Sequence, residues 1–139
     1  MIGIADTSFV IAVFDNNDNF HEQSLAIYRS YQPIYLPQST LAEIGYFLTK
    51  RYSNLTAAFF LARFPHTRYR LIPLEDEDIM RTAEILQKYA DLRVDFVDAT
   101  IAAVAERMNI TRILTLDRRD FGLIRPRHIQ QFELLPEKA

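Results

Sequence analysis

The stretch Ile2–Ser8, which reads IGIADTS, predicts a short apolar strand that ends at an acid, Asp6. A second apolar run, Arg112–Leu116, is also followed directly by an acid, Asp117. In open parallel sheets, binding and catalytic sites form outside the carboxyl ends of the strands. If these two runs are neighbouring strands, the two carboxylates lie together at that edge of the sheet.

The rest of the chain alternates predicted strands with predicted helices. The patterns favour further strands over residues 34–36, 69–74 and 132–135, and helices over residues 9–14, 20–31, 39–51, 54–62, 75–90 and 95–108. Residues 15–19 are predicted to be a loop and residues 117–122 a turn. Pro73 indicates that the strand over residues 69–74 lies at an edge of the sheet or ends at this proline. This alternation predicts an α/β fold with a mostly parallel sheet, and 139 residues suit a single domain.

The predicted helix over residues 39–51 carries an apolar stripe of Leu41, Ile44 and Leu48, and three later helices carry one as well. The stripes of these three consist of Leu55, Ala58, Phe59 and Ala62 in the first, Ile79, Ala83, Leu86 and Ala90 in the second, and Ile101, Val104, Ala105 and Met108 in the third. We expect the stripe that begins at Ile79 to form one buried face. The acids at positions 75–78 fit the first turn of that helix, where its dipole stabilises negative charge.

The composition is that of an ordinary globular protein. Hydrophobic residues make up 49% of the chain, charged residues 24%, and the formal net charge is −2, which gives no overall positive field toward a nucleic acid. All but three of the 16 basic residues are arginine, whose planar guanidinium suits phosphate. The chain has no cysteine, no secretory signal and no apolar run near the ~20 residues of a membrane span, so we expect a cytoplasmic protein without a membrane partner.

Four acids are candidates for one site: Asp6, Glu43, Asp98 and Asp117. Two of them have simple alternative interpretations, since Asp6 can cap the following helix and Glu43 lies off the apolar stripe of its helix, as a solvated glutamate would. Asp95 and Asp98 are three residues apart in the first turn of a helix, where the helix dipole favours both. The small residues that follow Asp98 make it the better candidate of the two.

A pocket formed by these acids predicts a metal-dependent hydrolase of phosphodiesters. Carboxylates a few ångströms apart raise each other's pKa, and a hard divalent cation such as Mg²⁺ or Mn²⁺ neutralises them. One cation would lower the pKa of a bound water, and another would stabilise the leaving 3′ oxygen. Four arginines are candidate phosphate contacts, although a solvated turn residue is the simpler interpretation for at least one of the first two: Arg118, Arg119, Arg125 and Arg127.

Four short motifs in this order resemble the PIN-domain ribonucleases. They are Asp6-Thr7-Ser8, Leu41-Ala42-Glu43, Val97-Asp98-Ala99 and the run Thr115–Phe121, TLDRRDF. The likeness spans almost the whole chain and is closest to the VapC toxins of bacterial toxin–antitoxin pairs. It implies that residues 1–139 form one PIN-like domain, a three-layer α/β/α sandwich with a mostly parallel central sheet.

The resemblance also implies roles for single residues. Asp6, Glu43, Asp98 and Asp117 would be the catalytic metal-binding acids, with Ser8 and Thr115 as accessory hydroxyls. For Glu43 this interpretation rests on the family alone, and Asp95 would cap its helix or hold a water near the site. The family further implies Mg²⁺ or Mn²⁺, an RNA substrate, a homodimer, and a small cognate antitoxin whose tail enters the acidic groove.

Three other functions use similar acids. A structure-specific DNA nuclease usually needs more chain to hold a duplex. An acid-pocket phosphotransferase needs a second aspartate two residues after a nucleophilic one, and this chain has Ser8 there. A catalytically inert interaction module would bind a basic peptide in the acidic groove, and an activity assay with Mn²⁺ separates it from a nuclease.

Overall fold

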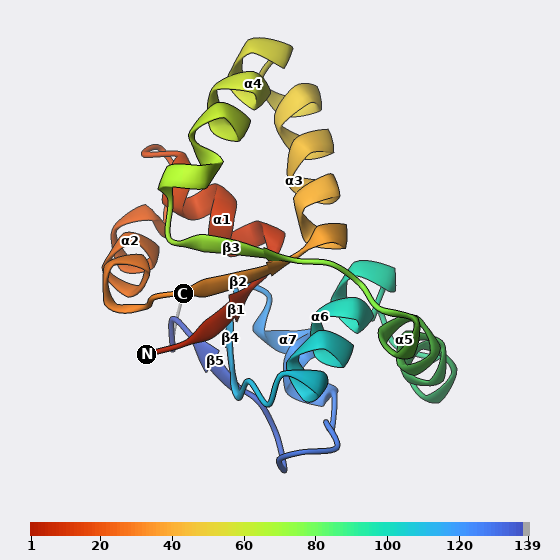
Figure 1. The fold of residues 1–139 in the computed structure, drawn as a ribbon. Helices are drawn as coiled ribbons and strands as arrows, with labels where there is room; N and C mark the ends of the chain where they lie inside the picture. Colours follow the sequence, from red (N-terminus) through yellow and green to blue (C-terminus); the bar gives the residue numbers. More distant parts are fainter. Residues whose placement is uncertain (138–139) are drawn as a thin grey trace.

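The computed structural model describes residues 1–137, in which five parallel strands form one central sheet (Figure 1). The strands are β1 (Gly3–Ala5), β2 (Ile34–Pro37), β3 (Tyr69–Ile72), β4 (Arg112–Leu114) and β5 (Glu133–Leu135). Their order across the sheet is β3-β2-β1-β4-β5, so β3 lies at an edge, as Pro73 predicts. The predicted parallel sheet is confirmed.

Within the described residues, seven α-helices cover the two faces of this sheet (Figure 1). They are α1 (Thr7–Phe14), α2 (His21–Ser30), α3 (Gln38–Arg51), α4 (Asn54–Arg63), α5 (Asp76–Lys88), α6 (Phe96–Arg107) and α7 (Arg118–Leu123), and a 3-10 helix, Phe64–His66, follows α4. Helices α1 to α4 contribute to the core on one face, and α5 to α7 to the core on the other. The fold is therefore a three-layer α/β/α sandwich.

The two central strands, β1 and β4, are buried on both faces. Ile4 pairs with Ile113, and both belong to the core beneath α6. Ala5 pairs with Leu114, and both belong to the core beneath α1 and α3. Continuous apolar runs are typical of strands that are covered on both sides.

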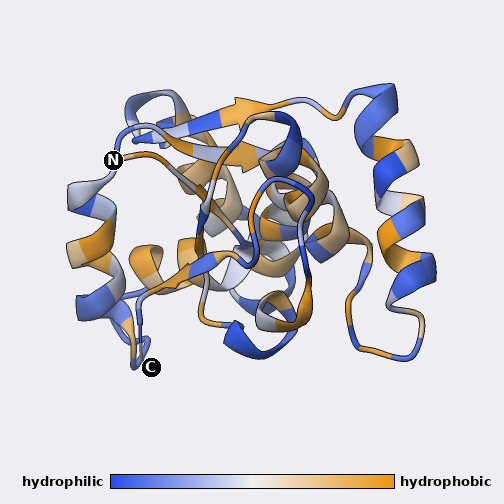
Figure 2. Cartoon of the chain, turned by 90° about the horizontal axis from the view of Figure 1, so that it is seen from below, coloured by the Kyte–Doolittle hydropathy of each residue, from blue (hydrophilic) through white to orange (hydrophobic). Residues whose placement is uncertain are grey.

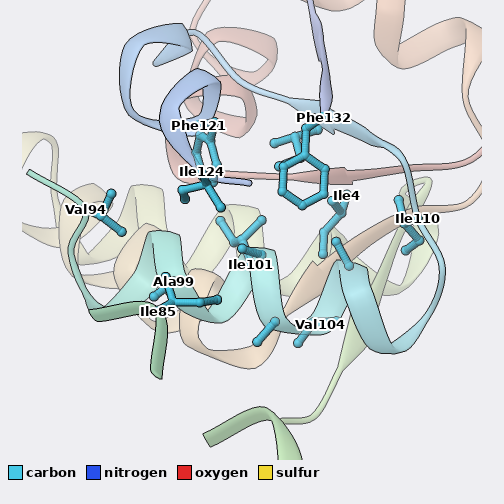
Figure 3. Packing of buried hydrophobic residues seen from close by; sticks show 14 of the residues in the cluster. Ile4, Ile85, Val94, Ala99, Ile101, Val104, Ile110, Phe121, Ile124 and Phe132 are labelled. Carbon is cyan, nitrogen blue, oxygen red and sulfur yellow. The ribbon is translucent and has the colours of Figure 1, made fainter. Parts of the chain in front are cut away.

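Helix α6 is buried along most of its length, since every residue from Ala99 to Ala105 is buried. Ile101 and Val104 belong to the same core cluster as Ile4 and Phe121, and Ile101 projects from α6 toward Ile124 and Ile4 (Figure 3). Alanines between these larger residues let the helix lie close to the sheet. The position of α6 fixes the location of the acids at its start.

Helices α3 and α4 pack on each other and extend beyond the sheet (Figure 1). In α4, Ala57 and Phe60 are buried, whereas Leu55 and Phe59 are 83% and 50% exposed. The apolar stripe that includes Leu55 and Phe59 therefore faces outward.

The predicted buried face of α5 is wrong. Ile79 is 51% exposed, whereas Asp78 and Thr82 are buried against α6. Arg107 of α6 donates a hydrogen bond from Nε to Asp78 Oδ1 at 2.9 Å, and Thr82 Oγ1 donates to the Asp78 carbonyl at 2.7 Å. Because the buried carboxylate is paired, polar residues can occupy the inner face. Figure 2 shows the resulting mixture of hydrophilic and hydrophobic residues along this outer helix, at the right edge of the view.

The predicted turn over residues 117–122 is also wrong, because residues 118–123 form α7. Asp117 is the residue before this helix, and Asp120 lies in its first turn.

No helix in the described part of the chain is both long and apolar enough to span a bilayer.

Candidate active site

Asp6 lies where β1 ends and α1 begins, and its side chain is only 6% exposed. Its Oδ1 accepts hydrogen bonds from the Phe9 backbone N–H at 3.0 Å and from the Ser8 hydroxyl at 2.7 Å. Its Oδ2 accepts a hydrogen bond from the Thr115 hydroxyl. Asp6 therefore caps α1, as one interpretation predicts, and three donors also fix the orientation of its carboxylate.

Ser8 and Thr115 connect the ends of the two central strands. The Ser8 hydroxyl accepts a hydrogen bond from the Leu116 backbone N–H at 3.0 Å, and Thr115 Oγ1 accepts one from the Asp117 backbone N–H at 2.8 Å. Each hydroxyl also donates to Asp6. The hydroxyls therefore hold the turn that carries Asp117 against the turn that carries Asp6.

An open cleft of about 570 Å³ lies at this edge of the sheet. Five parts of the chain line it: the end of β1 with helix α1, the loop between α1 and α2, helix α3, the start of α6, and the β4–α7 junction. The lining residues are Asp6, Thr7, Ser8, Ile11, Asp18, Glu43, Tyr46, Phe47, Asp95, Asp98, Leu116 and Asp117. The structure thus brings the four candidate acids into one cleft, together with Ser8 and Asp95. Thr115 is fully buried behind Asp6.

Glu43 reaches the cleft from α3, whose Ile44 and Leu48 are buried in the core. The Thr7 hydroxyl of α1 donates a hydrogen bond to Glu43 Oε1. Glu43 is therefore a partly buried, hydrogen-bonded cleft residue, and its interpretation as a solvated surface glutamate is wrong.

Asp95 and Asp98 have different roles at the start of α6: Asp95 caps the helix, and Asp98 lines the cleft with the other acids. Asp95 is the N-cap, and its Oδ1 accepts a hydrogen bond from the Asp98 backbone N–H at 2.9 Å. Asp95 is exposed, whereas Asp98 is partly buried among the other acids. Because Asp95 satisfies the helix end, the Asp98 carboxylate is available to the cleft.

The sequence patterns did not identify Asp120 as a site residue. One carboxylate oxygen from each of Asp98, Asp117 and Asp120 lies within 4.8 Å of the other two. Asp120 is only 8% exposed, and it reaches this group because α7 begins right after Asp117. The spacing of three between Asp117 and Asp120, the same as between Asp95 and Asp98, is the signal that could have indicated it.

Burial and the charges of neighbouring acids raise the pKa of three carboxyl groups of the cleft, those of Asp6, Asp98 and Asp117. Burial raises the pKa of Asp6 to about 6, against the opposing effect of its hydrogen bonds from Thr115, Ser8 and Phe9. Burial raises the pKa of Asp98 to about 8, and the charges of Asp95, Asp6 and Asp117 add to this shift. The pKa of Asp117 is raised as well, first by burial and then by Asp120.

The chemistry of this donor set fits a hard divalent cation. The donors are carboxylate and hydroxyl oxygens, which such cations prefer to nitrogen and sulfur. The oxygens of Asp98, Asp117 and Asp120 are close enough to share one ion. A bound cation would also relieve the repulsion that raises the pKa of Asp98.

The four candidate arginines do not line the cleft. Arg118 donates from one guanidinium nitrogen to the Leu134 carbonyl at 2.8 Å and to the Pro136 carbonyl at 2.6 Å, so it anchors α7 to the C-terminal segment. The Arg125 guanidinium donates to the Gly122 carbonyl, and that of Arg127 pairs with Glu84 at 2.9 Å. Arg119, two residues after Asp117, is exposed.

Residues 4–125 match the PIN domain family. The chain belongs to this family. It is also 30% identical, over 134 residues, to Ribonuclease VapC26 of Mycobacterium tuberculosis (strain ATCC 25618 / H37Rv), with 96% of this chain and 99% of the relative covered. The chain is therefore a VapC-like PIN domain, as its four motifs indicate.

Solved structures share the fold at lower sequence identity. The M. tuberculosis toxin VapC20, described as cleaving the sarcin–ricin loop, has a TM-score of 0.76 and 24% identity, with 85% of this chain and 91% of VapC20 covered. VapBC2 from Rickettsia felis, bound to a DNA fragment from its promoter, has a TM-score of 0.72 and 18% identity, with 96% and 98% covered. These likenesses show that the architecture is that of the VapC structures.

Proposed function

We propose that this protein is a metal-dependent endoribonuclease and the toxin of a toxin–antitoxin pair. The observation that carries the proposal is the convergence of Asp6, Glu43, Asp98 and Asp117, from four separate segments, on one cleft. Membership of the PIN family and the likeness to a VapC ribonuclease support the choice of RNA as substrate.

The acids would hold one or two Mg²⁺ or Mn²⁺ ions. When bound, such an ion lowers the pKa of a neighbouring water and neutralises charge on the phosphate and the leaving oxygen. We assign Asp98, Asp117 and Asp120 to one ion because their oxygens already lie within 4.8 Å of one another. Asp6 and Glu43 line the same cleft and would complete the oxygen set.

The remaining polar residues orient these acids. Ser8, Thr115 and the Phe9 backbone N–H fix both oxygens of Asp6, and Thr7 fixes Glu43. Preorganised ligands need no rearrangement when the substrate phosphate arrives, which lowers the cost of reaching the transition state. Asp98 must lose its proton before it can bind a cation, so cation binding releases protons near neutral pH.

The family relationship also supports two partners. Several structural neighbours are toxin–antitoxin complexes, among them VapBC of Salmonella typhimurium and FitAB, each bound to DNA. We propose that a small cognate antitoxin inhibits this chain by placing a basic tail against the acids of the cleft. We further propose a homodimer and a cytoplasmic location, where the RNA substrate and such an antitoxin are found.

The test is a cleavage assay on the purified chain with Mn²⁺, using RNA and DNA of the same sequence. RNA cleavage that leaves 5′-phosphate and 3′-hydroxyl ends supports the proposal, because water is then the nucleophile and the ribose 2′-hydroxyl is not. Cyclic 2′,3′-phosphate ends would exclude it. Preference for DNA would favour a structure-specific nuclease, and no cleavage of either would favour an inert interaction module.

Matched variants connect the activity to this cleft. Asp98→Asn removes an anionic ligand and should lower the cleavage rate by more than about 100-fold. Asp91→Asn makes the same chemical change at an exposed position outside the cleft and should leave the rate unchanged. Equal rates for the two variants would remove the cleft from the mechanism.

A further inference from the structure

An exposed aromatic side chain stands at the rim of the acidic cleft. Tyr46 of α3 lines the cleft and is 65% exposed. It follows Glu43 by three residues, so it lies about one helical turn farther along the same side of α3. Phe47 lines the cleft next to it.

The fold does not use the Tyr46 ring for packing. The buried side of α3 consists of Thr40, Ile44 and Leu48, and the helix keeps this side against the core whatever occupies position 46. A tyrosine with most of its surface in water gains little from burial. Because the ring lies at the rim of the cleft and is mostly exposed, it is accessible to a ligand bound there.

Two cations accompany the aromatic residues on the last turns of α3. The Lys50 Nζ lies 5.7 Å from the centroid of the Tyr46 ring, and the Arg51 Cζ lies 5.7 Å from the centroid of the Phe47 ring. Both cations are exposed. One helix thus presents, in order away from the metal site, an acid, an aromatic pair and a basic pair.

This order matches a nucleic-acid strand that leaves the metal site. Aromatic faces stack on bases, and Lys or Arg side chains contact the phosphates of the backbone. We propose that Tyr46 stacks on an unpaired RNA base next to the scissile phosphate, and that Lys50 contacts a phosphate farther along the same strand. The inference rests on the proposed ribonuclease function and adds to it two residues, Tyr46 and Lys50, that would hold the RNA strand beside the cut.

Charge complementarity favours RNA over a basic peptide on the part of α3 that carries Tyr46, Phe47, Lys50 and Arg51, beyond the acids where the antitoxin tail is proposed to lie. A basic peptide attracted to the acids would meet like charges at Lys50 and Arg51, whereas a phosphate backbone would meet opposite ones. The base must be unpaired, because in a duplex both of its faces are already stacked on neighbouring bases.

Binding measurements test this inference separately from cleavage. All proteins carry Asp98→Asn to prevent cleavage, and the probes are a fluorescein-labelled mixed-sequence single-stranded RNA and its duplex. Tyr46→Ala should weaken binding of the single strand by about 5- to 100-fold, as loss of one stacked base does, and should change duplex binding by less than about twofold. Tyr46→Phe, which keeps the ring, should bind the single strand like the parent.

Two further variants complete the set. For single-strand binding, the logarithm of the association constant falls linearly with the logarithm of the salt concentration. Lys50→Gln should make this slope less steep by about 0.7, which is the contribution of one phosphate contact. Phe59→Ala is the matched control, because Phe59 is a half-exposed aromatic beside a cation, the Arg63 Cζ at 3.9 Å from its ring centroid, and it lies outside the cleft. Its single-strand affinity should equal that of the parent.

Other outcomes overturn the inference. Unchanged single-strand binding by Tyr46→Ala would do so, as would an equal loss with Phe59→Ala or with the duplex. If Tyr46→Ala instead weakened binding of an oligo-arginine peptide, or turned a dimer into a monomer in sedimentation with RNA affinity intact, the surface would belong to a protein partner. Cleavage assays on proteins that keep Asp98 separate the two proposals. If the parent cleaves RNA and Tyr46→Ala cleaves it equally well, only this inference fails. If the parent does not cleave RNA, the proposed function itself fails.

Discussion

The Thr115 hydroxyl donates a hydrogen bond to Asp6 Oδ2 across 109 positions of the chain. Thr115 follows β4 and Asp6 follows β1, and these strands are neighbours in the sheet. The bond therefore couples the two strand ends that carry acids of the cleft. It also helps to hold the Asp6 carboxylate, which is only 6% exposed, in a defined orientation.

Removing this hydroxyl should damage both the fold and the site. Thr115→Val leaves a buried oxygen of Asp6 without its donor, so the free energy of unfolding should fall by about 1–3 kcal/mol. The affinity for Mn²⁺ should fall by about 10- to 100-fold, because the carboxylate loses its orientation. Urea unfolding and calorimetric Mn²⁺ titration measure the two effects. Thr115→Ser keeps the hydroxyl and should retain most of both; equal damage in the two variants would assign the effect to packing.

The stability of the metal-free protein should fall as pH rises from about 4 to 8. Folding raises the pKa of Asp6 from 3.8 to about 6 and that of Asp98 from 3.8 to about 8. Over this window the folded state binds more protons than the unfolded state, so the free energy of unfolding decreases with pH. For Asp6 alone the difference is about 3 kcal/mol. Urea unfolding in a metal chelator at several pH values checks this, and Asp98→Asn should flatten the upper part of the profile. A stability that rises steadily from pH 5 to 8 in both proteins would contradict the pKa shifts.

Asp120 should contribute to cation affinity. Its carboxylate oxygen lies within 4.8 Å of those of Asp98 and Asp117, so Asp120→Asn removes one negative charge from the group. We expect Mn²⁺ affinity in calorimetry to fall by about 10- to 100-fold, with Asp91→Asn as the unaffected control. An unchanged affinity would mean that Asp120 serves only the first turn of α7.

The ion pair between α5 and α6 should matter for stability far more than surface pairs do. Asp78 is 1% exposed and accepts hydrogen bonds from Arg107, so Arg107→Ala leaves a buried charge unpaired. The free energy of unfolding should fall by about 3 kcal/mol. Arg112→Ala breaks the exposed pair with Glu133 and should cost less than about 1 kcal/mol. Similar losses in urea unfolding would contradict this difference.

The sequence patterns predicted the sheet and the meeting of Asp6 with Asp117 because both follow from local rules. Apolar runs mark buried strands, and parallel strands end at the same edge of the sheet. The location of Glu43 needed more than periodicity, because its contact with Thr7 depends on how α1 packs against α3. The assignment of Glu43 to the metal site therefore rests on the resemblance of the whole chain to the PIN-domain ribonucleases.

The patterns failed at Asp78 and Arg118 because the decisive partner is distant in the chain, and at Asp120 because its helix is short. Asp78 takes an inner position on α5 because Arg107 pairs with it from α6, and periodicity does not register such a pair. Arg118 is a phosphate candidate in the sequence, but the carbonyls of Leu134 and Pro136 bind its guanidinium. The sequence pattern places Asp120 in a turn because the six residues of α7 are too few to show a helical hydrophobic period.

The most direct test of the shared cation site is the melting temperature at pH 7.5 with and without millimolar Mn²⁺. A cation at a hundredfold excess over its dissociation constant stabilises the fold by about 2.7 kcal/mol, which raises the melting temperature of a domain of this size by about 5–10 °C. We predict this rise for the natural chain and for Asp91→Asn, and its loss in Asp98→Asn. A melting temperature that Mn²⁺ leaves unchanged, or raises equally in all three proteins, would contradict the account.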